Sequence, residues 1–167
     1  MEDVFQKLIL MIRAYYPVLY LHSYEYYRTK QKIKGIVELL RREGKKVNYY
    51  QWDCVYGLVQ ILPDKTEKRI ERMQNPLEVL AYILNSKKSG EKNIFVLDDI
   101  NNHIERDEVK LMFRKIAEAT NNNTHAIILS SIYRLPAELE KYITVLQIPL
   151  PKRNELGEVL DIVAKQS

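Results

Sequence analysis

The stretch NIFVLDDI, residues 93–100, decides how the rest of the chain is interpreted. Four apolar residues in a row are followed directly by two acidic residues, Asp98 and Asp99. A short, continuously apolar run with polar residues at its ends is typical of a strand buried on both faces of a parallel sheet. The stretch therefore predicts a buried strand, and it raises the question whether the two carboxylates hold a metal ion or only end that strand.

Segments on both sides of this strand alternate between helical and strand patterns. Apolar residues recur at the helical interval in residues 1–15, 24–43, 75–84, 109–117 and 156–163. Further short apolar runs predict strands in residues 17–22, 46–52, 125–131 and 143–150. Residues 62–74 are polar and without clear periodicity, which predicts a loop or a short exposed helix. The alternation predicts a three-layer α/β/α domain with a five-stranded parallel sheet.

The composition is that of a soluble globular domain. The chain has 167 residues, of which 46% are apolar and 29% are charged, with a net charge of +4. It contains one cysteine, Cys54, so an intrachain disulfide is excluded. No apolar run approaches the roughly 20 residues that span a bilayer, and the N-terminus does not resemble a secretory signal. A cytoplasmic location without membrane partners is expected.

The two acids lie where ligands bind in sheets of this kind. In a parallel α/β sheet the site forms at the carboxyl ends of the strands, where Asp98 and Asp99 are predicted to emerge. An apolar strand followed by two acids is the Walker B pattern, in which the first acid holds Mg²⁺ and the second positions the attacking water. Asp98 is therefore the candidate magnesium ligand. The alternative, that the acids cap a helix or form a turn, is common in α/β proteins.

A Walker B strand that serves ATP chemistry needs a phosphate loop of the form G-x-x-x-x-G-K-[ST]. The chain has five glycines, and none of them completes this motif. After the first predicted strand, where the loop belongs, stand His22, Ser23 and Glu25. ATP hydrolysis by this chain is therefore not expected, and Mg²⁺ and ATP are cofactors only of a residual site in which His22 and Ser23 take the place of the missing loop.

Six segments together resemble a known family. They are YPVLYLHSYEYYR (16–28), PLEVLAYIL (76–84), IFVLDDI (94–100), AIILSS (126–131), LPAELEKYITVLQIPLP (135–151) and RNELGEVL (153–160). Over nearly the whole chain they resemble the N-terminal domain of the uncharacterised AAA+ ATPases of cyanobacteria and plastid genomes. The resemblance implies a P-loop NTPase (AAA+)-like fold in which residues 1–167 form one degenerate domain without the Walker A loop and the helical lid. In that family a complete ATPase domain follows, so the chain is the first part of a longer protein or a short stand-alone relative.

The same resemblance implies roles for single residues. Asp98 and Asp99 correspond to the Walker B position, and Ser130 or Ser131 to the sensor 1 position at the end of the fourth strand. Glu140-Lys141 stands where paired arginines often complete a neighbouring site, which leaves Arg134 as a substitute. The implied function is an assembly or regulatory module with AAA+ subunits, or further copies of itself, as protein partners.

Two other functions compete with this interpretation. The tyrosine-rich segment 24–42 could bind single-stranded nucleic acid by stacking bases, with basic residues Arg28, Lys30, Lys32, Lys34, Arg41 and Arg42. A receiver-like phosphoacceptor domain would use Asp98, Ser130 and Lys152, although the acids it needs after the first strand are absent.

The remaining candidate ligands do not form a metal site in the sequence. His22, His103 and His125 have no metal-site spacing. Cys54 is expected to be a packed thiol.

Overall fold

The computed structural model describes residues 2–119 and 123–150. The helix predicted for residues 156–163 lies outside the described residues. The α-helices are α1 (Glu2–Arg13), α2 (Tyr26–Arg42), α3 (Pro76–Ser86) and α4 (Asp107–Glu118). The strands are β1 (Val18–His22), β2 (Val47–Asp53), β3 (Gly57–Ile61), β4 (Glu67–Ile70), β5 (Lys92–Asp98), β6 (Thr124–Ser130) and β7 (Thr144–Gln147). Short 3₁₀ turns are η1 (Lys87–Ser89), η2 (Ile100–His103) and η3 (Ala137–Leu139).

The sheet has seven strands in the order β4-β3-β2-β5-β6-β1-β7. The five predicted strands, β1, β2, β5, β6 and β7, are parallel, which confirms the predicted parallel sheet. β3 and β4 extend this sheet in antiparallel pairing. The prediction of a loop or helix for residues 62–74 is wrong over Glu67–Ile70. β4 is an exposed edge strand, so its residues carry no apolar alternation from which a strand could be recognised.

The strand order separates two of the predicted fold types. β1 lies between β6 and β7 and pairs with both of them. In a receiver-type sheet the first strand lies beside the second, in the order 2-1-3-4-5. The receiver-like alternative is therefore wrong, because here β2 pairs with β5 and is separated from β1 by two strands.

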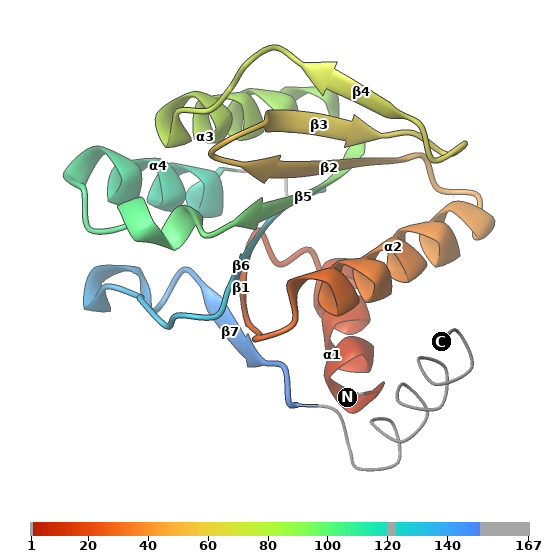
Figure 1. Cartoon of the computed structure of the whole chain (residues 1–167), viewed down its shortest axis with the longest axis horizontal. Coiled ribbons are helices and arrows are strands. Elements are labelled where there is room, and N and C mark those ends of the chain that lie inside the picture. Colours follow the sequence, from red (N-terminus) through yellow and green to blue (C-terminus); the bar gives the residue numbers. More distant parts are fainter. Residues whose placement is uncertain (1, 120–122, 151–167) are drawn as a thin grey trace, which may run out of the picture.

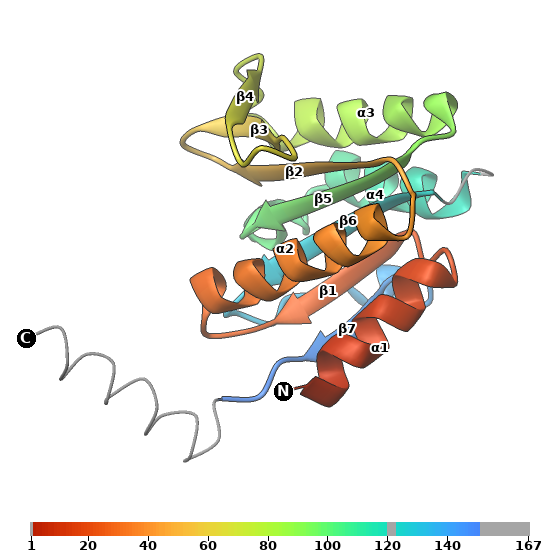
Figure 2. The ribbon, with the colours of Figure 1, turned by 90° about the vertical axis from the view of Figure 1, so that its right-hand side faces the viewer.

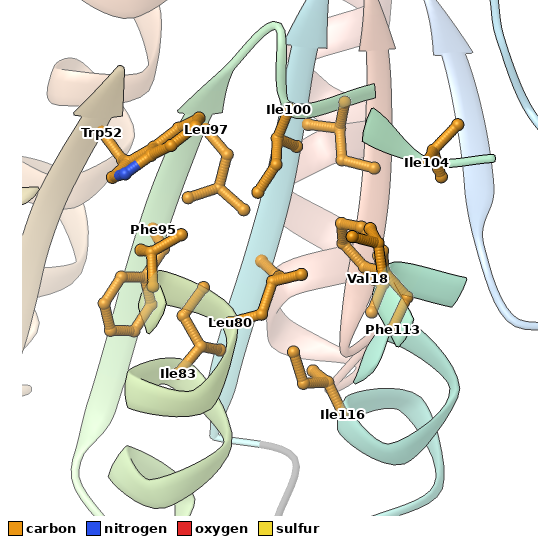
Figure 3. Close-up of a cluster of buried hydrophobic side chains, with 14 of the residues drawn as sticks. Val18, Trp52, Leu80, Ile83, Phe95, Leu97, Ile100, Ile104, Phe113 and Ile116 are labelled. Carbon is orange, nitrogen blue, oxygen red and sulfur yellow. The ribbon is translucent and has the colours of Figure 1, made fainter. Parts of the chain in front are cut away.

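Helices cover both faces of the sheet, α1 and α2 on one side and α3 and α4 on the other (Figure 1, Figure 2). Two apolar clusters fill the spaces between the layers. Figure 3 shows the cluster on the α3 and α4 side, where Ile83 lies below Phe95 of β5 and Phe113 lies beside Val18 of β1. The continuously apolar character of β5 follows from this burial on both faces.

Local signals in the sequence account for the helix ends. The side chain of Asn75 caps α3 by accepting a hydrogen bond from the Leu77 N–H at 2.9 Å, and Pro76 occupies the first helical turn. Gly44 follows α2 with a φ of +86°, the left-handed conformation that glycine adopts without strain. Among the described residues, no helix is long and apolar enough to cross a membrane.

Candidate functional site at the carboxyl edge of the sheet

Three neighbouring parallel strands bring the sequence-predicted site residues together. β5, β6 and β1 end at the same edge, with His22 opposite Ser130 and Asp98 opposite Leu129. Asp99 and Ser131 follow β5 and β6 directly. The convergence follows from the parallel register, because adjacent parallel strands deliver their carboxyl ends to one edge.

A lysine that the sequence did not single out for this site neutralises the first acid. Lys30 lies in the first half of α2, and its ammonium group donates a hydrogen bond to Asp98 Oδ2 and forms an ion pair with it. The Asp98 side chain is 16% exposed, and its Oδ1 is buried without a hydrogen-bond partner among the described residues. Burial raises the pKa of Asp98 above its usual value, and the bond from Lys30 opposes that rise. The positive charge beside Asp98 is therefore supplied by the Lys30 side chain.

A tyrosine from the same helix binds the second acid. The Tyr26 hydroxyl donates to Asp99 Oδ1 and accepts a hydrogen bond from the Ser131 N–H at 2.8 Å. Ser131 Oγ lies 3.3 Å from the same hydroxyl. Asp99 itself has a φ of +56° and begins η2, so its backbone turns the chain away from β5. Tyr26 thus ties Asp99 to the loop that follows β6. These five residues, Asp98, Asp99, Lys30, Tyr26 and Ser131, are called the acid site below.

The connection from β1 to α2 is short, and its side chains form hydrogen bonds within the connection and with the start of α2. Only residues 23–25 join the two elements. Ser23 is 1% exposed, and its Oγ accepts a hydrogen bond from the Glu25 N–H at 3.1 Å and bonds Thr29 Oγ1 at 2.9 Å. A phosphate loop needs a longer, glycine-rich stretch whose backbone N–H groups surround the phosphates. The Ser23 side chain instead fixes the start of α2.

Both ring nitrogens of His22 are engaged within the protein. Nδ1 lies 2.7 Å from Gln147 Oε1, and Nε2 lies 3.0 Å from the Ser131 carbonyl oxygen. The rings of Tyr24 and Tyr133 contact the imidazole at centroid distances of 5.4 and 6.3 Å. His22 therefore holds the ends of β1, β6 and β7 together.

A second network fixes the loop after β6. The Tyr20 hydroxyl donates to the Ile132 carbonyl oxygen at 2.6 Å and accepts from Asn101 Nδ2 at 2.9 Å and from the Arg134 N–H at 3.0 Å. Arg134, which was predicted to substitute for the missing arginine pair, donates from its side chain to Asn102 Oδ1 at 3.3 Å. Ser130 Oγ is also used locally, because it accepts from the Ile132 N–H at 3.1 Å.

The residues at this edge do not fit a magnesium nucleotide. Mg²⁺ requires an octahedral shell of oxygen ligands, and the oxygen of Asp98 that has a partner is bound to an ammonium group. Within residues 2–119 and 123–150 no group of three or more His, Cys, Asp or Glu could hold a metal ion.

The other candidate ligands lie elsewhere in the fold. His125 is buried near the amino ends of the strands, 2.9 Å from Lys92 Nζ, and burial lowers its pKa to about 4. Cys54 is exposed in the turn between β2 and β3, so the prediction of a packed thiol is wrong. The turn is held by Asp53, whose carboxylate accepts from the backbone N–H groups of residues 55 and 56.

The basic residues of α2 are partly used within the protein. Lys30 binds Asp98, and the Arg41 guanidinium donates two hydrogen bonds to the Val47 carbonyl oxygen, at 3.1 and 2.8 Å. Arg28 pairs with Glu25 at 3.7 Å. The nucleic-acid interpretation stays a prediction.

The sequence did not predict Lys30 and Tyr26 as partners of the two acids, and it singled out Lys30 only as a candidate nucleic-acid contact. Tyr26 and Lys30 lie four residues apart on α2, so they share a helical face. This spacing is the only signal in the sequence, and it does not identify acids 68 and 73 residues away as their partners.

A sheet with β1 between β6 and β7, and with two acids at the end of β5, defines an α/β domain of the P-loop NTPase type. Residues 4–148 match the family model of the N-terminal domain of SpoVK-like AAA ATPases, and the chain belongs to this family.

Similar proteins agree with this assignment. The chain is 28% identical over 153 residues to an uncharacterised AAA domain-containing protein, ycf46, of Guillardia theta, with 90% of the chain and 28% of the relative covered. It is 28% identical over 155 residues to the ycf46 protein of Trieres chinensis, with 92% and 29% covered. The chain thus spans less than a third of these relatives' length. The structure of the Aeropyrum pernix ORC2 protein in ADPNP-ADP complexes is similar in fold, with a TM-score of 0.57 and 13% identity over 98% of this chain and 50% of that one.

Proposed function

We propose that this domain is a catalytically degenerate AAA+ domain that does not hydrolyse ATP by itself and serves as an assembly or regulatory module. The observation that carries the proposal is the ion pair between Lys30 and Asp98. The ammonium group supplies the positive charge that Mg²⁺ supplies in an active Walker B site. A metal ion would have to displace a lysine that is only 22% exposed. Binding of a metal ion to Asp98 would leave the Lys30 ammonium group without its carboxylate partner.

The surface around the acid site supports a protein partner. Six large apolar side chains at this edge, five in loops and Tyr27 in the first turn of α2, are half exposed or more: Tyr24, Tyr27, Val55, Tyr56, Ile132 and Tyr133. Aromatic side chains are enriched in the cores of protein interfaces, and exposed apolar groups that gather on one side mark interaction sites. The partner we propose is another AAA+ domain, either in the same assembly or in a second copy of this chain.

Calorimetric titration with Mg·ATP tests the loss of nucleotide chemistry. We expect no binding heat at millimolar nucleotide for the wild type, because the acid site is filled by Lys30 and Tyr26. Asp98→Asn is the matched control, since the amide oxygen can still accept the hydrogen bond from Lys30 while the charge is removed. Micromolar binding by the wild type that Asp98→Asn abolishes would contradict the proposal, because the acid would then serve a working metal site.

Sedimentation velocity of the same samples tests the module function. The chain is expected to associate with itself, or with an added AAA+ domain of a family member, through the exposed tyrosines. Tyr27→Ser with Tyr133→Ser should abolish this association. Leu10→Ser is the control, since Leu10 is 63% exposed on α1, on the α1 and α2 face and outside the carboxyl-edge loops. Equal loss in both variants, or no association of the wild type with either partner, would argue against an assembly role.

A further inference from the structure

A cavity of about 430 Å³ lies between α2 and the turn that joins β3 to β4. The turn and the last turns of α2 lie at the same end of the sheet (Figure 1). The lining residues come from four elements, and they are Gln31, Lys34, Gly35, Val37, Glu38 and Arg41 of α2, Tyr49 of β2, Ile61 of β3, and Leu62, Pro63 and Lys65 of the turn. Clefts of roughly 300–1,000 Å³ are the usual size of small-molecule sites. The cavity, called the α2 cavity here, begins one residue beyond Lys30 and shares no residue with the acid site.

A glycine in the interior of α2 keeps this space open. A Cβ atom built on Gly35 would have no neighbour within 4 Å. Gly35 is absent from the residues with positive φ, so the backbone does not require glycine there. Glycine inside a helix is about 1 kcal/mol less favourable than alanine. Its structural consequence at residue 35 is an unobstructed helix surface, over which a ligand could lie.

The lining combines a small apolar floor with a basic rim. Val37, Tyr49 and Ile61 of the lining are buried, with 1%, 1% and 7% of their surface exposed, and they form its floor. Lys34 and Lys65 make no ion pair with any carboxylate in the described part of the chain. The one carboxylate of the lining, Glu38, reaches Arg42, 4.0 Å away and outside the lining. The cavity therefore has a surplus of positive charge above an apolar floor.

The turn that closes the cavity has a fixed shape. The Leu62 N–H donates to the Thr66 carbonyl oxygen at 2.9 Å, and the Lys65 N–H donates to the Leu62 carbonyl oxygen at 2.8 Å. Asp64 Oδ1 accepts from both the N–H and the hydroxyl group of Thr66, at 3.0 and 2.6 Å. On the opposite wall, the two bonds from Arg41 to the Val47 carbonyl oxygen hold its guanidinium in place. The walls are thus formed before any ligand binds.

We propose that the α2 cavity binds a small organic anion, with its flat apolar part against Val37, Ile61 and Tyr49 and its carboxylate or phosphate between Lys34 and Lys65. Charge-assisted hydrogen bonds from ammonium groups to carboxylate or phosphate oxygens are stronger than neutral ones. The apolar floor stabilises the rest of the molecule by removing its surface from water. A neutral compound of the same shape loses the first contribution and keeps only the second.

Three naphthalene probes test both halves of the proposal. The probes are 1-naphthoate, 1-naphthyl phosphate and neutral 1-naphthamide, each titrated into the ¹⁵N-labelled chain and followed by amide chemical shifts. Both anions should shift the amides of Gly35 and Lys65 in a saturable way, and the neutral amide should bind at least about tenfold more weakly. A preference for naphthoate or for naphthyl phosphate identifies the anionic group that the cavity favours.

Two pairs of variants locate the site. Gly35→Leu should abolish binding because the side chain projects into the space in which the ligand would lie, whereas Gly35→Ala adds one methyl group and should keep it. Lys34→Gln with Lys65→Gln should weaken both anions about tenfold and leave 1-naphthamide unchanged. The proposal is overturned if 1-naphthamide binds as tightly as the anions, if Gly35→Leu binds like the wild type, if the shifts map to the acid site, or if no saturable shift appears at millimolar probe. The amide spectrum of each variant reports whether it is folded.

Discussion

The acid site and the α2 cavity lie along the same helix, yet they are built in opposite ways. In the acid site, Lys30 and Tyr26 reach across to Asp98 and Asp99 and occupy the space beside both carboxylates. In the α2 cavity, Gly35 has no side chain and the space next to it is open. The neighbouring lysine, Lys34, has no carboxylate partner among the described residues. Side chains one to two turns apart on α2 therefore close one region and leave the other open. The family resemblance predicts ligand binding at the acid site, whereas the α2 cavity is the region with space for a ligand.

The largest expected effect is that of Lys30→Met. This change removes the partner of a largely buried carboxylate whose Oδ1 already lacks a hydrogen bond. We expect the free energy of unfolding at pH 7 to fall by about 3 kcal/mol, measured by urea denaturation. The affinity of the α2 cavity for 1-naphthoate should stay the same, which would show that the two regions are independent.

The pH dependence of this loss identifies its cause. Burial raises the pKa of Asp98, and removal of Lys30 takes away the interaction that lowers it. The folded variant then binds a proton more tightly than the unfolded chain, so the loss should shrink as the pH falls toward about 5. Lys30→Met with Asp98→Asn should recover most of the loss at pH 7. An equal loss at both pH values, or no recovery in the double variant, would mean that the ion pair is not the cause.

A smaller effect is expected from Tyr26→Phe. The hydroxyl that is removed donates to Asp99 and accepts from the Ser131 N–H. Loss of these bonds should lower the free energy of unfolding by about 1.5 kcal/mol, again measured with urea. The control is Tyr27→Phe, because Tyr27 is the next residue of the same helix and its side chain is 78% exposed. If both variants behave alike, Tyr26 does not hold the acid site closed.

The smallest effect, and the only stabilising one, is expected from Gly35→Ala. The new methyl group meets no atom within 4 Å and removes the cost of glycine inside a helix. The free energy of unfolding should rise by about 0.5–1 kcal/mol, seen as a higher urea midpoint. Gly44→Ala is the matched control, since its surroundings are equally open but its φ is +86°. It should destabilise the chain, and a gain at Gly44 as large as at Gly35 would contradict this explanation.

The parts of the fold that sequence reasoning predicted are those that local patterns specify. The helical intervals, the Asn75 cap and the apolar strands β1, β2, β5, β6 and β7 follow from burial along one element at a time. Parallel register then explains why His22, Asp98 and Ser130 end at one edge. β3 and β4 were both not predicted, β4 because an exposed edge strand has no apolar signal of its own.

The sequence by itself determined the class of the fold, the position of the two acids and the absence of a glycine-rich phosphate loop. Only the tertiary structure decided what stands beside those acids and where the chain leaves space. Lys30 and Asp98 are 68 residues apart, and a lysine in a polar helix has the same local pattern whether it faces solvent or a carboxylate. The α2 cavity likewise depends on how far the β3–β4 turn lies from α2. Local propensities act over a few residues, whereas these pairings depend on how whole elements pack.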